Sequence, residues 1–125
     1  MNDFIVKFVF QPLAISIDFE VAAFNAIHRH FPGAQLFGCL YHLTKNARKK
    51  LASVPGSIQR YQEDPKFAHH CRCVIAVAFV PINDVDRALT VLEQNLPRDV
   101  KFLLDWFEEY YVGMSNCLII LAYMR

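Results

Sequence analysis

The hydrophobic and polar positions near the start of the chain first follow the pattern of a strand and then that of a helix. Leu13 to Ile17 is a short apolar run with β-branched residues, which is typical of a buried strand. From Phe19 to Phe31 apolar residues recur at helical spacing, and Pro32-Gly33 ends the helix. One face of this helix carries Phe19, Ala23, Ala26, Ile27 and Phe31. Gln35 to Leu40 is a second apolar run, so we expect a strand, a helix and a second strand parallel to the first.

A helix with two distinct faces follows the second predicted strand. Its apolar stripe consists of Leu40, Leu43, Ala47 and Leu51. Its opposite face carries Lys45, Arg48 and Lys49. The stretch from Ser53 to Ser57 contains Pro and Gly and breaks the helix. We therefore expect the basic face to point to solvent.

The second half of the chain has the pattern of helices throughout. Asp64 followed by Pro65 is a helix N-cap with proline at the first helical position, and this helix extends to Pro81. Asn83 can cap the next helix, whereas Pro97 ends that helix and can start the last one. The expected apolar faces are Phe67, Cys71, Ile75, Ala78 and Phe79 in the first helix, Val85, Ala88, Leu89, Leu92 and Leu96 in the second, and Val100, Leu103, Leu104, Phe107 and Tyr111 in the third.

The composition allows a core and divides the chain by charge. With 125 residues, 54% hydrophobic residues and 11 Phe, the sequence excludes a disordered chain and fits one domain or part of one. No Asp or Glu occurs from Val21 to Gln62, although this stretch holds six Lys and Arg residues. Between Glu63 and Tyr111, nine acidic residues outweigh five basic ones. The first half of the chain can therefore offer a basic surface, and the second half cannot.

The cysteines and the apolar runs of the sequence indicate in which cellular compartment the protein is found. The sequence has four Cys but no signal peptide, and a core of this size needs no disulfides, which favours a reducing compartment. The longest apolar run, Cys117 to Met124, is far shorter than the ~20 residues of a membrane-spanning helix. We expect a soluble protein of the nucleus or cytoplasm without a membrane partner.

Asp18 is the first candidate for chemistry, because it stands at the carboxyl end of the first predicted strand. In α/β sheets, ligand sites and catalytic groups gather at that end of the strands. A helix begins directly behind Asp18, however, and Asp is also a favoured helix N-cap. The sequence pattern by itself leaves both roles open.

Cys39 and His42 are the second candidates, at the junction of the second strand and the basic helix. Both residue types bind zinc, but a zinc site needs about four ligands. His69 and Cys73 lie one helical turn apart and could add two ligands, whereas Cys71 and Cys73 point to nearly opposite sides. The alternative is a buried small residue at Cys39 and a solvated or capping imidazole at His42, and we prefer this alternative to zinc.

The basic helix face is the third candidate. Such a face is commonly only solvated, but it could also contact a phosphate backbone, and the absence of nearby acids favours that role. The residues concerned are Lys45, Arg48, Lys49 and Lys50, together with His42. Tyr41 and Tyr61 could stack on bases or pack within the fold.

Several separated segments together resemble a known family. They are Asp18-Phe-Glu-x-Ala-x-x-Asn-Ala-Ile27, Phe31-Pro-Gly-Ala-x-Leu-x-Gly-Cys-x-Tyr-His-Leu-x-Lys-Asn46, Tyr61-Gln-Glu-Asp-Pro-x-Phe67, Ala76-x-Ala-Phe-Val-Pro-Ile-Asn-Asp-Val85 and Trp106-Phe-Glu-Glu-Tyr-Tyr-Val-Gly113. In this order they are similar to the transposase domain of Mutator-like elements (MULE transposases). The resemblance covers about residues 12 to 113.

The resemblance implies an α/β fold that is mostly helical. Residues 1–58 would form part of a ribonuclease H-like core, residues 59–113 an all-helical insertion, and residues 114–125 a divergent tail. In the family, three acids (Asp, Asp, Glu) hold two Mg²⁺ or Mn²⁺ ions that cut and rejoin DNA, because these hard cations prefer oxygen ligands. Asp18 matches the second acid and would be the metal ligand, whereas Cys39 and His42 match a Cys-x-x-His signature whose role is open.

The chain also departs from the family pattern. The first acid belongs on an upstream strand and the third beyond the insertion, and neither has a match here; Glu108 and Glu109 match the end of the insertion instead. We therefore expect a fragment of a MULE-type, DDE-type DNA transposase that has no catalytic activity by itself and binds no metal stably. The alternative is a non-enzymatic DNA-associated or protein-interaction module that contacts DNA through the basic helix at 42–50. A third hypothesis is a product without function.

Overall fold

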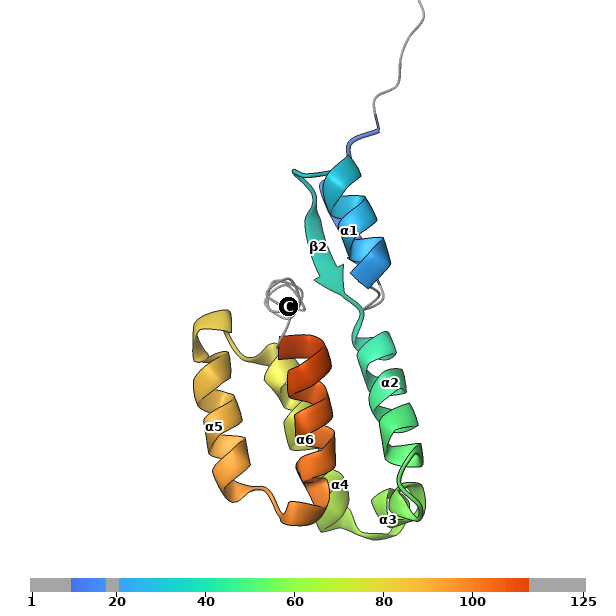
Figure 1. Ribbon diagram of the computed structural model, residues 1–125, viewed down its shortest axis with the longest axis vertical. Helices are drawn as coiled ribbons and strands as arrows, with labels where there is room; N and C mark the ends of the chain where they lie inside the picture. The colour runs from blue at the N-terminus through green and yellow to red at the C-terminus, as the bar shows by residue number, and fades with distance from the viewer. Residues whose placement is uncertain (1–9, 18–20, 113–125) are drawn as a thin grey trace, which may run out of the picture.

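The computed structural model describes residues 10–17 and 21–112, and Figure 1 shows its two parts. A strand–helix–strand unit lies at one end of the long axis, and a helical bundle forms the rest. The described chain is thus mostly helical with one small sheet, as the sequence predicts. None of its helices is long and apolar enough to cross a membrane.

The strand–helix–strand unit consists of β1 (Ala14–Ile17), α1 (Val21–His30) and β2 (Gln35–Gly38). The two strands pair in parallel, with Ala14 opposite Gln35 and Ile17 opposite Gly38, which confirms the predicted parallel arrangement. β2 ends two residues earlier than expected, because Leu40 already begins the next helix.

The apolar face of α1 differs from the expected one. Phe24, which was not assigned to that face, is buried with Ile17 and Leu36, and Ile27 packs partly against them. Ala26 is exposed. The cause is that a two-stranded sheet covers only a narrow strip of the helix, and the large Phe24 ring fills that strip better than an alanine methyl group.

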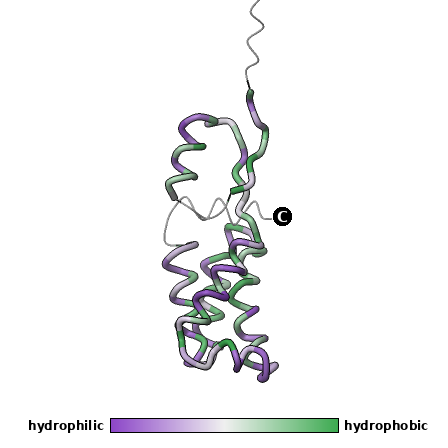
Figure 2. The backbone as a smooth tube through the Cα atoms, turned by 90° about the vertical axis from the view of Figure 1, so that its right-hand side faces the viewer, coloured by the Kyte–Doolittle hydropathy of each residue, from purple (hydrophilic) through white to green (hydrophobic). Residues whose placement is uncertain are grey.

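The helical bundle is built from five α-helices in the described residues. These are α2 (Leu40–Ala52), α3 (Ser57–Glu63), α4 (Pro65–Ala76), α5 (Val85–Asn95) and α6 (Lys101–Phe107). The 3₁₀ turns η1 (Val77–Phe79) and η2 (Ile82–Asp84) lie between α4 and α5, η3 (Arg98–Val100) lies between α5 and α6, and a π-helical turn, η4 (Glu108–Val112), continues α6. Figure 2 shows polar and apolar segments alternating along these helices, as expected for amphipathic helices around a shared core.

The bundle core agrees closely with the predicted stripes. The fully buried side chains include Leu43 of α2, Val74 of α4 and Phe107 of α6. The expected face of the last helix is buried at every position: Val100, Leu103, Leu104, Phe107 and Tyr111. Asn46 of α2 also donates a hydrogen bond of 3.1 Å from Nδ2 to the Tyr111 hydroxyl, which links the first and last parts of the bundle.

Two predicted helix starts have different outcomes. Asp64 caps α4 as expected: its Oδ1 accepts hydrogen bonds from the backbone N–H groups of Lys66 (3.0 Å) and Phe67 (3.2 Å). The prediction that Asn83 caps α5 is wrong, because α5 begins only at Val85. The backbone N–H of Asp84 donates to the Pro81 carbonyl at 2.8 Å, so the chain is already in a 3₁₀ turn at residue 83.

A short helix, α3, interrupts the stretch expected to separate α2 from α4. Gly56 precedes it with φ of 78°, a left-handed conformation that glycine adopts without strain. The expected division between residues 58 and 59 lies inside α3. By packing, α2 belongs with the later helices, because its buried residues join their core, whereas Ile17, Phe24 and Leu36 form a separate cluster. The expected tail at 114–125 lies outside the described residues.

Candidate functional site

The carboxyl ends of β1 and β2 lie at one edge of the sheet. The backbone N–H of Cys39 donates to the Ile17 carbonyl at 3.1 Å and ties the two strand ends together. Asp18 directly follows Ile17 in the sequence but lies outside the described residues, so both of its predicted roles stay open.

Cys39 and His42 lie one helical turn apart at the start of α2. Cys39 is the N-cap residue of α2 but makes no side-chain capping bond, and both side chains are half-buried. The Nδ1 atom of His42 is buried and has no hydrogen-bond partner among the residues the structure describes. The imidazole ring packs edge-on against Tyr41, with ring centres 5.6 Å apart. This nitrogen could accept a hydrogen bond or bind a metal, but Cys39 and His42 supply at most two ligands.

The other Cys and His residues do not complete a metal site. His69 and Cys73 lie together on α4, with Sγ 3.7 Å from Nε2, as their spacing predicts. Cys71 lies in the bundle core, where burial is the main cause that raises its thiol pKa to about 11. Within residues 10–17 and 21–112, no three His, Cys, Asp or Glu side chains converge. The described residues therefore do not fit the Mg²⁺ or Mn²⁺ that the resemblance implies.

The basic face of α2 points to solvent as expected. Lys45, Arg48 and Lys49 are exposed, whereas Leu43, Ala47 and Leu51 on the other side are buried. No ion pair joins these three cations to another described residue. Their charges therefore remain available to an anionic partner.

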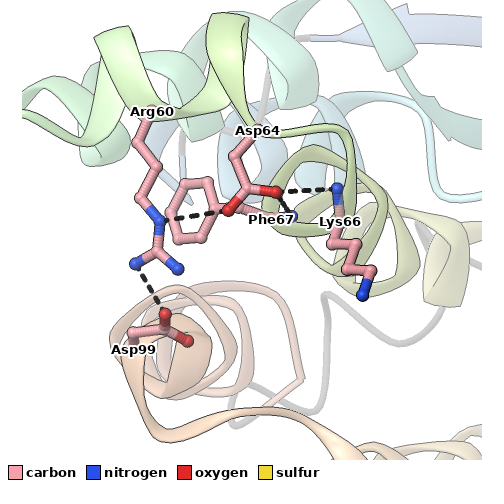
Figure 3. Close-up of polar contacts among 5 residues, drawn as sticks. All are labelled: Arg60, Asp64, Lys66, Phe67 and Asp99. Carbon is pink, nitrogen blue, oxygen red and sulfur yellow. Dashed lines mark hydrogen bonds and ion pairs between the residues drawn. The ribbon is translucent and has the colours of Figure 1, made fainter.

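Arg60, a further cation of the first half of the chain, forms ion pairs within the fold. Figure 3 shows its guanidinium between two carboxylates: Nη1 lies 2.6 Å from Asp99 Oδ2, and Nε lies 3.5 Å from Asp64 Oδ2. The guanidinium carbon also lies 4.4 Å from the centre of the Phe67 ring. The pKa of Asp64 is lowered, chiefly because the Phe67 N–H stabilises the carboxylate, and Arg60 adds to this. The cluster connects α3 to α4 and to η3, so Arg60 is not part of the basic surface.

A groove of about 760 Å³ lies beside the basic face, lined by residues of α2, α3, α4, η1 and one residue of α6. We call it the basic groove. The side chains that define its character are Tyr41, Lys45, Arg48, Tyr61, Arg72 and Phe79. Tyr61 packs partly against the bundle core, whereas Tyr41 is 67% exposed. Lys49 is not among its lining residues, so the predicted basic patch is divided between the groove and the outer surface.

Arg72 and Phe79 were not predicted as site residues. Phe79 was expected in the core but is 48% exposed, because α4 gives way to a 3₁₀ turn at Val77. The tighter turn has three residues per turn, which rotates Phe79 off the apolar face of α4. Leu40 was also expected in the core and is 41% exposed at the first position of α2.

The comparisons with known proteins give no match. No family model matches the sequence, and neither a curated protein nor a solved structure matches this chain. The resemblance to MULE transposases therefore stays a prediction.

Proposed function

We propose that this chain is part of a MULE-type DNA transposase, that it contributes part of a ribonuclease H-like core, and that it binds DNA through α2. The observation that carries the proposal is the order of elements at the sheet edge. Asp18 follows β1, Cys39 follows the parallel strand β2, and a basic helix with His42 begins there, followed by a helical bundle. This is the order that the resemblance requires.

We propose further that this chain does not cleave DNA by itself. The family reaction needs three acids around two cations, and Asp18 is the one acid for which this chain has a match. A single carboxylate cannot supply enough protein ligands to fix two divalent ions about 4 Å apart. We expect no Mg²⁺-dependent or Mn²⁺-dependent nicking of supercoiled plasmid above that of an Asp18→Ala variant. Nicking that disappears in this variant would contradict the proposal.

The DNA contact that we propose is electrostatic. Lys45, Arg48 and Lys49 follow the i, i+3, i+4 spacing of one helix face, so all three can approach one phosphate backbone. Each phosphate contact releases counterions, and the logarithm of the binding constant falls with the logarithm of salt concentration by about 0.9 per contact. Loss of three contacts should therefore reduce that slope by about 2.7.

The test is binding of a labelled duplex, measured by fluorescence anisotropy between roughly 50 and 200 mM salt. The triple variant Lys45→Glu, Arg48→Glu, Lys49→Glu should bind at least tenfold more weakly than the unaltered chain and with a shallower salt dependence. The matched control reverses three exposed cations of the acidic half, with the changes Lys66→Glu, Arg87→Glu and Arg98→Glu. Salt-independent binding, or an equal loss in the control, would refute DNA binding through α2.

A further inference from the structure

The basic groove leaves large apolar side chains in contact with water. Leu40, Tyr41 and Phe79 line it and are 41%, 67% and 48% exposed. Ile58 and Ile75 add partly buried aliphatic surface. Large exposed apolar side chains gathered in one concave site are typical of a binding surface, because covering them removes apolar area from water.

The charge of the groove is of one sign. Lys45 and Arg48 of α2 and Arg72 of α4 contribute positive charge, and the lining residues include no Asp or Glu. None of the three cations is ion-paired within the described part of the chain. The complementary ligand must therefore combine apolar groups with negative charge.

We infer that the basic groove binds an acidic amphipathic helix of a partner protein. In this mode, apolar side chains spaced i, i+3 or i+4, and i+7 enter the groove, and flanking carboxylates face Lys45, Arg48 and Arg72. The residues of α2 that line the groove run from Leu40 to Leu51. At 1.5 Å per residue this is about 17 Å, enough for about three turns of a bound helix.

The apolar lining favours such a peptide over duplex DNA. A phosphate backbone can pair with the three cations, but it has no apolar groups to bury against Leu40, Ile75 and Phe79. The proposed duplex contact also uses Lys45 and Arg48, but Lys49 does not line the groove, so a change of Lys49 should affect duplex binding alone. The inference does not depend on the transposase proposal.

The test is titration of the chain into a fluorescein-labelled 14-residue helical peptide with Leu or Phe at the apolar positions and Glu at the flanking ones. We expect saturable one-to-one binding that weakens as salt is raised. Tyr41→Ser with Phe79→Ser should weaken it at least tenfold, and so should Arg72→Glu. Val91→Ser, an exposed apolar residue outside the groove, should leave it unchanged. Circular dichroism of each variant verifies that the helices remain.

The duplex titration in parallel separates this inference from the proposed function. Lys49→Glu should weaken duplex binding and leave peptide binding within twofold, whereas the Tyr41 and Phe79 double variant should do the reverse. The inference is overturned by equal binding of a peptide with Lys in place of Glu, or by groove variants that bind normally. Self-association of the chain that sedimentation detects and that Arg72→Glu abolishes would also overturn the inference. So would single-stranded DNA that binds more tightly than the peptide and whose binding requires Tyr41 and Phe79.

Discussion

The strand–helix–strand unit and the helical bundle differ mainly in how much core each has. The unit buries Ile17, Phe24 and Leu36, with two more side chains partly covered. The bundle buries a much larger set that spans α2 to η4, including several side chains that are fully enclosed. A unit with three buried apolar side chains gains little free energy from burial, whereas a bundle of amphipathic helices around a larger core is a stable arrangement.

Because of this difference, the more stable part of the molecule is not the part with the sheet edge where the sequence predicts catalytic chemistry. The carboxyl ends of β1 and β2 belong to the weakly packed unit, whereas the residues that line the basic groove belong to the helical bundle. A binding site on rigid elements keeps its geometry without its ligand. We therefore expect the groove to be preformed and the sheet edge to depend more on its neighbours.

Thiol reactivity should give the largest contrast between the two parts. Cys39 is half-buried at the junction with the sheet, whereas Cys71 is in the bundle core with a pKa raised to about 11 by burial. At pH 8 only about one Cys71 thiol in a thousand is ionised, and the thiolate is the reactive form. We expect a variant that keeps only Cys71 to react with a disulfide reagent at least a hundredfold more slowly than one that keeps only Cys39, because burial in the bundle core limits both ionisation and access.

In denaturant, the variant that keeps only Cys71 and the variant that keeps only Cys39 should react at similar rates, which serves as the control. Equal rates under native conditions would show that the bundle opens as readily as the unit, and would contradict the comparison.

Core truncations should show the next largest difference. Phe107→Ala removes a fully buried ring of the bundle and should lower the free energy of unfolding by about 3–5 kcal/mol. Phe24→Ala should lower it by no more than about 0.5 kcal/mol when Trp106 fluorescence reports the transition, because the unit has its own cluster. Trp106 is the one tryptophan of the chain, and its ring lies 5.2 Å from that of Tyr111.

Urea titration followed by Trp106 fluorescence and by hydrogen exchange measures both effects. If Phe24→Ala shifts the Trp106 transition as strongly as Phe107→Ala does, the unit and the bundle unfold together.

The parts of the fold that the sequence predicted correctly are those with a strong local signal. The five apolar residues from Val100 to Tyr111 follow a strict helical period, and Asp64-Pro65 combines two start signals in adjacent residues. The errors at Phe24, Phe79 and Asn83 arise where the packing partner or a 3₁₀ turn decides the outcome. A helical period carries no information about the width of the neighbouring sheet or a change of helix type.

The candidate site could be predicted only in part for the same reason. The exposed face with Lys45 and Arg48 follows from the spacing within α2. The groove needs Arg72 and Phe79 opposite that face, and their position depends on how α4 packs on α2. Arg60 looked equally available in the sequence, yet it pairs with Asp99, which is 39 residues away. Pairing across such a distance is set by tertiary structure.

The carboxylate of Asp64 gives the smallest predicted effect and a pH-dependent one. Its pKa is lowered below the usual 3.8, first by the Phe67 N–H and then by the Lys66 N–H and Arg60. The folded state therefore favours the ionised form, and this contribution to stability is fully present above pH 3.8 and is lost as the pH falls through the lower folded pKa. Asp64→Asn keeps a capping side chain but removes the charge, so its melting temperature should be lower than that of the unaltered chain at pH 7.

The difference in melting temperature between Asp64→Asn and the unaltered chain should narrow below pH 3.8 and disappear as Asp64 becomes protonated. Thermal unfolding followed by circular dichroism from pH 7 to pH 2.5 measures it. Asp105→Asn removes an equal charge from an exposed carboxylate of α6 that has no side-chain hydrogen bond among the described residues, so it should show no such pH-dependent difference. If the melting temperature of Asp64→Asn stays below that of the unaltered chain at low pH, the amide caps α4 poorly. The charge of Asp64 beside Arg60 would then not be the cause of the difference in stability. The described residues of the strand–helix–strand unit form no ion pair, so this electrostatic contribution would belong to the bundle.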